Sequence, residues 1–106
     1  MRPDRVLFVR DLDPARIADY RRDHDNVWPE LVALYKRCGI NEVSCFIGGS
    51  RLAVFFETDP AVFPKMREVL AADPIEQKWQ AAMAKYDLPG AKAVTFEEVY
   101  RQSDHG

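Results

Sequence analysis

EVSCFIGGSRLAVFFE, residues 42–57, contains two short runs of strand-forming residues separated by a turn. The runs at 42–47 and 51–57 are rich in β-branched and aromatic residues, and Gly-Gly-Ser at 48–50 joins them. Two such runs across a glycine-containing turn predict an antiparallel β-hairpin. The other elements can be placed around this hairpin.

Two further strands are predicted near the ends of the chain. Residues 5–10 (RVLFVR) are β-branched and aromatic and lie between charged and turn residues. Residues 93–101 (AVTFEEVYR) form the last such run before the polar tail. The chain therefore supplies four strands, of which the hairpin contributes the middle two.

Three aspartate–proline pairs predict the starts of helices. An aspartate at the N-cap followed by proline at the first helical position occurs at residues 13–14, 59–60 and 73–74. The second and third pairs begin helices that run to about residues 72 and 86. The first pair begins a longer helical segment that ends at Cys38, because Gly39 is a typical helix stop.

The long helical segment has one apolar face and an internal proline. Pro29 has no N–H to donate and would clash with the carbonyl of Asp25, which costs an unbroken helix about 3 kcal/mol. We therefore expect a break near Asp25 and Asn26, with Asn26 as a new N-cap and Pro29 in the first turn of the second half. The predicted inward face consists of Ile17, Tyr20, His24, Val27, Leu31, Leu34 and Cys38.

The order strand, helix, strand, strand, helix pair, strand fits a ferredoxin-like α+β fold. This βαββαβ arrangement has a four-stranded antiparallel sheet with the helices on one face. An apolar uncovered face is usually buried by dimerisation, so we expect a homodimer. With 106 residues and no internal repeat or linker, residues 1–106 are expected to form one domain. Apolar material for the two faces of the sheet comes from Leu7, Val9, Phe46, Phe55, Val94 and Phe96.

Composition and charge argue against several classes of partner. Hydrophobic residues make up 47% of the chain and the formal net charge is -2, so nothing in the charge favours nucleic acid or an anionic membrane. The first apolar run, residues 6–9, is too short for a signal peptide or a membrane span, which predicts a cytoplasmic protein. Cys38 and Cys45 form no metal-ligand pattern, and we interpret them as a helix-end core residue and a strand residue.

Tyr20 and His24 are the candidates for chemistry, because they lie one helical turn apart and can reach a common pocket. Histidine has an unperturbed pKa of about 6.5, which suits proton transfer near neutral pH. Trp28 and Trp79 offer flat apolar faces, and such a face can bind the C–H surface of a sugar ring. Spacing alone nevertheless favours Tyr20 and His24 as core residues with satisfied polar groups. A metal site is disfavoured, because His24 has no co-ligands at a recognised spacing.

The segment at residues 20–31 has the form YxxxHxxxWPEL, which resembles the signature of the L-rhamnose mutarotase family. The similarity extends over nearly the whole chain. It includes Gly39, the hairpin, the segment IEQKW at residues 75–79 and the closing strand FEEVY at residues 96–100. Trp79, about fifty residues after the WPEL motif, completes the pattern.

The resemblance implies a dimeric ferredoxin-like enzyme that interconverts the α and β anomers of a 6-deoxy-hexose with neither metal nor cofactor. Opening and reclosing the pyranose requires a general acid and a general base within reach of one ring. By analogy with the family, His24 transfers the proton, and Tyr20 forms hydrogen bonds or takes the complementary proton step. Trp79 would pack against the sugar, while Trp28 would shape the wall of the pocket.

One position departs from the family pattern. L-rhamnose mutarotases typically have two adjacent tryptophans in the third helix, whereas Gln80 follows Trp79 here. The single-tryptophan form looks similar to relatives associated with L-fucose, so L-rhamnose and L-fucose are both candidate monosaccharides. Two alternatives stay open: a sugar-binding or regulatory module without turnover, and a small dimeric ferredoxin-like monooxygenase or isomerase.

Overall fold

The hairpin predicted at residues 42–57 forms one half of the sheet. In the computed structural model, which describes residues 2–106, β2 (Ile40–Gly48) pairs antiparallel with β3 (Arg51–Thr58) across a two-residue turn. The predicted hairpin is confirmed.

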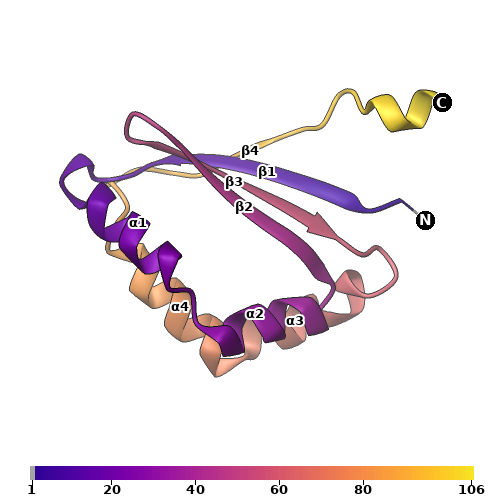
Figure 1. Cartoon of the computed structure of the whole chain (residues 1–106), viewed down its shortest axis with the longest axis horizontal. Coiled ribbons are helices and arrows are strands. Elements are labelled where there is room, and N and C mark those ends of the chain that lie inside the picture. The colour runs from indigo at the N-terminus through magenta and orange to yellow at the C-terminus, as the bar shows by residue number, and fades with distance from the viewer. Residues whose placement is uncertain (1) are drawn as a thin grey trace.

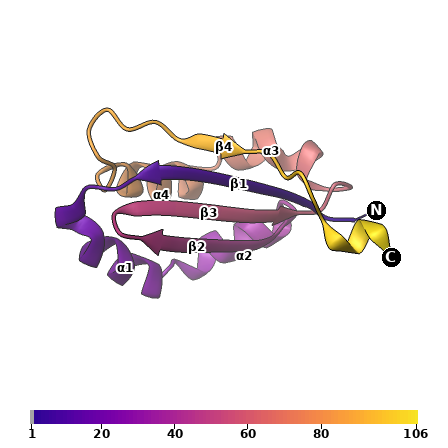
Figure 2. The ribbon, with the colours of Figure 1, turned by 90° about the horizontal axis from the view of Figure 1, so that it is seen from above.

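The second half of the sheet is built on β1 (Asp4–Asp11), which lies between β3 and β4 (Val94–Phe96). The strand order is β2-β3-β1-β4, and each neighbouring pair is antiparallel (Figure 2). In this order β1 and β4, the first and last strands of the chain, pair with each other beside the β2–β3 hairpin, as in the ferredoxin-like α+β fold. The predicted fold class is therefore confirmed.

The last strand is shorter than predicted. Only Val94–Phe96 pairs with β1, whereas the predicted strand covered residues 93–101. Beyond β4 the chain leaves the sheet: Val99 is 89% exposed, and Arg101 turns back to donate from Nη1 to the Pro3 carbonyl oxygen at 2.7 Å. This contact carries the chain across the end of β1, which overrides the strand propensity of the segment.

The long helical segment breaks where the proline predicts. A 3-10 turn (η1, Pro14–Arg16) leads into α1 (Ile17–Asp25), and α2 (Pro29–Arg37) begins at the proline itself. Asp13 has the predicted capping role, because its carboxylate accepts a hydrogen bond from the Ala15 N–H at 3.0 Å.

The predicted cap at Asn26 is wrong. The N-cap of α2 is Trp28, whose backbone is extended and whose side chain makes no capping hydrogen bond. Asn26 instead ends α1, and its side-chain amide donates to the Arg22 carbonyl oxygen at 3.1 Å. A residue before proline is restricted to extended backbone, so the cap falls on the neighbour of Pro29.

The second pair of helices follows β3. α3 (Phe63–Ala72) starts three residues later than predicted, because Asp59 accepts from the Ala61 N–H at 2.8 Å and first closes a turn. α4 (Pro74–Ala84) starts as predicted, with the Asp73 carboxylate accepting from the Ile75 N–H at 2.8 Å. A second 3-10 turn (η2, Gln102–His105) ends the chain.

The helices lie on one side of the sheet, with α1 and α2 alongside α4 and α3 (Figure 1). Of the seven residues of the predicted inward face, four are buried, Tyr20, Leu31, Leu34 and Cys38, and three are partly exposed, Ile17, His24 and Val27. Two buried clusters join this helical layer to the sheet, one around Leu31, Leu52 and Trp79 and one around Leu34 and Leu70. No helix within residues 2–106 is long and apolar enough to cross a membrane.

The two faces of the sheet differ in what covers them. The register places Phe8, Val54 and Cys45 side by side on the face that meets the helices. It places all six apolar strand residues named from the sequence on the opposite, uncovered face: Leu7, Val9, Phe46, Phe55, Val94 and Phe96. Three of these side chains are more than half exposed: Phe46, Val94 and Phe96.

Candidate active site

A cavity lies between the helices and the face of the sheet that they cover. It has a volume of about 490 Å³, and side chains from β1, β2, β3, α1, α2 and α4 line it. Small-molecule sites commonly have volumes in this range. Three of the four predicted site residues line the cavity: Tyr20, His24 and Trp79. Trp28, the fourth, lies outside the set of lining residues found within 2–106.

His24 is held by two contacts with Tyr20, one turn earlier in α1. Its Nδ1 lies 2.9 Å from the Tyr20 carbonyl oxygen, and the two rings stack with their centroids 4.0 Å apart. Because a carbonyl oxygen only accepts, Nδ1 carries the proton in this bond, and Nε2 of the neutral ring keeps its lone pair. His24 can therefore accept a proton at the cavity wall through Nε2 and return it.

Tyr20 is 3% exposed and supplies a phenol to the same end of the cavity. Burial raises the pKa of this phenol, the neighbouring Cys45 thiol raises it further, and the Arg10 guanidinium lowers it. Arg10 is itself paired with Asp87, with 3.1 Å between Nε and Oδ1. The Tyr20 phenol is consequently neutral near pH 7 and acts as a hydrogen-bond donor there.

The two tryptophans have different positions. Trp79, on α4, is 7% exposed; its ring meets the edge of His24 at 5.4 Å between centroids. Trp28 meets Trp79 edge-on at 5.1 Å and packs against the core cluster. Trp79 is thus both a core residue and a wall of the cavity, while Trp28 supports Trp79 from outside the cavity.

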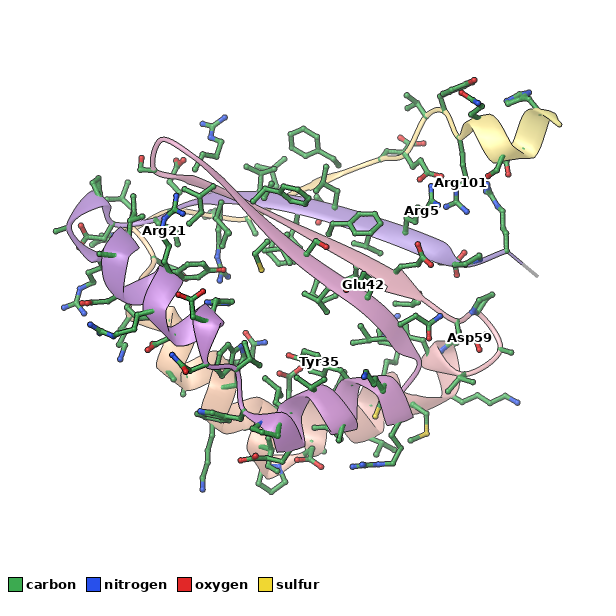
Figure 3. All side chains as sticks on the ribbon, viewed as in Figure 1. Arg5, Arg21, Tyr35, Glu42, Asp59 and Arg101 are labelled. Atoms are coloured by element: carbon green, nitrogen blue, oxygen red, sulfur yellow. The ribbon has the colours of Figure 1, made fainter. Side chains whose placement is uncertain are left out.

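A polar group that no motif in the sequence indicates joins α2 to α4. The Tyr35 hydroxyl donates to Glu76 Oε1 at 2.7 Å, and Gln80 Nε2 donates to the same oxygen at 3.1 Å. Tyr35 and Gln80 line the cavity, and Figure 3 shows Tyr35 on the side of α2 that faces the sheet. The only signal in the sequence was spacing: Glu76 and Gln80 are four residues apart, on the helix that carries Trp79.

A second tyrosine anchors α1 to the end of α4. The buried Tyr86 hydroxyl donates to the Asp23 carboxylate, and this hydrogen bond raises the pKa of Tyr86. The Tyr86 ring also meets Tyr20 edge-on at 5.8 Å. Asp23 directly precedes His24, so this contact fixes the part of α1 that carries the histidine. Residues 2–106 contain no group of three or more His, Cys, Asp or Glu side chains that could hold a metal ion.

A two-layer α+β fold that encloses an aromatic cavity lined by a histidine and a buried phenol is the arrangement expected of a small enzyme of the acid–base type. Comparison with known proteins identifies the family. The sequence profile of the L-rhamnose mutarotase family matches residues 5–102, and the chain belongs to this family.

Similar proteins agree with this assignment. An L-fucose mutarotase of Xanthomonas campestris pv. campestris is 37% identical over 98 residues, which cover 86% of this chain and 78% of the relative. An L-rhamnose mutarotase of Acidiphilium cryptum is 34% identical over 88 residues, covering 76% and 77%. The crystal structure of an L-rhamnose mutarotase from Formosa agariphila superposes with a TM-score of 0.74 and 29% identity, covering 92% of this chain and 97% of that one.

Proposed function

We propose that this protein is a sugar mutarotase that interconverts the α and β anomers of L-rhamnose or a related 6-deoxy-hexose such as L-fucose. Family membership and the names of the relatives, which include both an L-rhamnose and an L-fucose mutarotase, support this activity. The observation that carries the proposal is the position of His24 at the wall of a cavity of about 490 Å³, with its Nδ1 2.9 Å from the Tyr20 carbonyl oxygen.

The reaction needs two proton movements, one on each of the two oxygens bonded to C1. The anomeric hydroxyl loses its proton while the ring oxygen gains one, the C1–O5 bond breaks, and the aldehyde rotates about C1–C2. The reverse steps on the other face of the aldehyde give the second anomer. A positioned acid–base pair typically accelerates such steps by about 10²- to 10⁴-fold.

In this proposal His24 Nε2 takes the proton of the anomeric hydroxyl. Nε2 is free to do so because the imidazole proton is on Nδ1, where it is hydrogen-bonded to the Tyr20 carbonyl oxygen. The Tyr20 phenol gives its proton to the ring oxygen as the C1–O5 bond breaks, while His24 gains the proton of the anomeric hydroxyl. Burial raises the pKa of Tyr20, so the phenol carries its proton near pH 7 before the step, and it takes the proton back when the ring closes. Ring closure reverses both movements, so no cofactor is required.

Trp79 supplies the apolar wall against which the C–H surface of the sugar packs in this proposal. Its ring lies in edge contact with His24 and is supported by Trp28, so both stay in place when the cavity fills. Trp28 therefore contributes to substrate binding indirectly, through Trp79.

We further propose that the protein is a single domain that acts in the cytoplasm as a homodimer. The family profile spans residues 5–102, which supports one domain. The uncovered face of the sheet supports the dimer, because its six apolar side chains are contiguous across four strands. A second copy of the same sheet would bury them by a self-complementary contact.

Exchange NMR of the anomeric protons tests the activity directly. We expect the purified protein to accelerate α–β exchange of L-rhamnose or L-fucose, and His24→Ala to reduce the rate to that of buffer with the fold retained. His105→Ala is the matched control, because it removes the other histidine of the chain at an exposed C-terminal position. A fully active His24→Ala variant would remove His24 from the mechanism. Binding of the sugar without exchange would favour a sugar-binding module.

A further inference from the structure

We propose that Tyr35, Glu76 and Gln80 form a hydroxyl-binding subsite that holds the sugar by the C3 and C4 hydroxyls, opposite the anomeric carbon. The identity of the ligand as an aldopyranose rests on the proposed function. The subsite is argued from a hydrogen-bond arrangement that the acid–base step does not use.

The arrangement fixes which polar atoms remain for a ligand. A carboxylate only accepts, so Glu76 Oε1 receives both the Tyr35 O–H and one N–H of Gln80. The phenolic oxygen of Tyr35 keeps its lone pairs, and Gln80 keeps its carbonyl oxygen and its second N–H. Glu76 stands outside the set of lining residues, while Tyr35 and Gln80 belong to it. Glu76 is thus a positioning residue for two groups that line the cavity.

The remaining atoms match a sugar hydroxyl better than other polar groups. They offer two acceptors and one donor, and a hydroxyl is both a donor and an acceptor. An adjacent pair of hydroxyls can donate to the two acceptors and accept from the Gln80 N–H. A methyl group can satisfy none of these atoms, and burying them unpaired against it is unfavourable. The subsite therefore selects ring hydroxyls rather than the C6 methyl of a 6-deoxy sugar.

The proposed pose of the sugar follows the cavity lining. Trp79 contacts His24, and Gln80 follows Trp79 in α4; all three line the cavity together with Tyr35. In this pose a pyranose packs against Trp79 with C1 at His24, and its opposite edge, which carries C3 and C4, meets Gln80 and Tyr35. L-rhamnose and L-fucose differ in configuration at C2 and at C4, so this subsite senses the second of these two differences.

Deoxy analogues test the subsite. The parent sugar is whichever of L-rhamnose and L-fucose exchanges faster. KM is measured by exchange NMR for this sugar and for its 3-deoxy and 4-deoxy analogues. We expect Tyr35→Phe and Gln80→Leu to raise KM for the parent sugar by about three- to tenfold, the effect of one neutral hydrogen bond, with kcat little changed. For the analogue that lacks the bound hydroxyl, we expect the KM of wild type to rise by the same factor. The KM of the variants should not rise further, because they have already lost that hydrogen bond.

Two further variants separate positioning from packing. Glu76→Leu frees both cavity groups, and we expect it to raise KM as the other variants do, whereas Glu76→Gln retains an accepting oxygen and should restore most of the affinity. Gln77→Leu is the matched control: Gln77 is exposed on the same helix and donates to the Ala71 carbonyl oxygen at 3.3 Å, outside the cavity lining. We expect it to leave KM unchanged.

The failure of the subsite and the failure of the proposed function give different results. If Tyr35→Phe and Gln80→Leu alter KM equally for the parent sugar and both analogues, or not at all, the subsite is refuted while the mutarotase activity stands. If wild type binds these sugars without accelerating exchange, the proposed function fails. The subsite is then tested by comparing Kd, in place of KM, for the same variants and sugars. A wild-type protein that binds none of them overturns both.

Discussion

The glycine between α2 and β2 gives a stability prediction that separates two physical effects. Gly39 has φ +88°, where a side chain is strained, and a Cβ placed on it would lie 2.8 Å from the Phe63 backbone nitrogen. The left-handed conformation costs a residue with a Cβ about 1–2 kcal/mol. The clash must move the start of α3, and overpacking of this kind costs about 1–3 kcal/mol more. For Gly39→Ala we therefore expect a loss of about 2–5 kcal/mol in the free energy of unfolding.

Gly90 offers the matched control. It has φ +79°, close to that of Gly39, but a Cβ there would meet no heavy atom within 4 Å. Gly90→Ala therefore incurs the conformational cost alone, about 1–2 kcal/mol. The difference between the two variants measures the contact with Phe63.

Urea denaturation followed by circular dichroism is the assay. With m near 1.5 kcal/mol/M, a value within the usual range for small proteins, a loss of 3 kcal/mol lowers the midpoint by roughly 2 M. Equal midpoints for Gly39→Ala and Gly90→Ala would refute the close approach of α3 to the end of α2. A Gly39→Ala midpoint equal to that of wild type would refute the strain as well.

Three more outcomes are expected. Phe46→Glu, a change at a 60% exposed position of the uncovered face, should convert a dimer to a monomer in light scattering, and a monomeric wild type would contradict the dimer. Burial raises the pKa of Tyr35 above its ordinary value of 10.0. The neutral phenol therefore contributes fully to stability below pH 10, and this contribution is lost as the pH rises further. Between pH 9 and 12 the urea midpoint of Tyr35→Phe should fall less than that of wild type. Tyr86→Phe removes the donor to Asp23 and should lower kcat more than it raises KM, whereas Tyr100→Phe, at a 65% exposed position, should change neither.

The sequence was sufficient to predict the elements whose cause is local. The break before Pro29 and the caps at Asp13 and Asp73 follow from the chemistry of single residues and their neighbours, and the structure has all three. The fourth strand shows where local reasoning ends. Residues 97–101 have the composition of a strand, but the contact from Arg101 to the Pro3 carbonyl directs the chain away from β1. That contact joins residues 98 positions apart, and no local pattern indicates it.

The candidate site divides in the same way. The stripe that carries Tyr20 and His24 was predicted from periodicity, because both residues belong to one helix. The hydrogen bond from Tyr35 to Glu76 joins residues 41 positions apart, and the hydrogen bond from Tyr86 to Asp23 joins residues 63 apart. Each depends on how α4 packs against α1 and α2, which is set by the whole core. The sequence could therefore indicate the proposed acid–base pair, but neither the groups that position it nor those at the far end of the cavity.

The break at Pro29 has a consequence for the site as a whole. His24 lies on α1 before the break and Tyr35 lies on α2 after it, while Trp79 and Gln80 face them from one continuous helix, α4. Changing the angle between α1 and α2 would therefore move His24, proposed for proton transfer, relative to Tyr35, proposed for hydroxyl binding. The proline sets this angle by excluding a straight helix, and Trp28 holds it by packing against Trp79. In the proposed reaction one sugar places C1 at His24 while its opposite edge is held at Tyr35, and the broken helix sets the distance between these two residues.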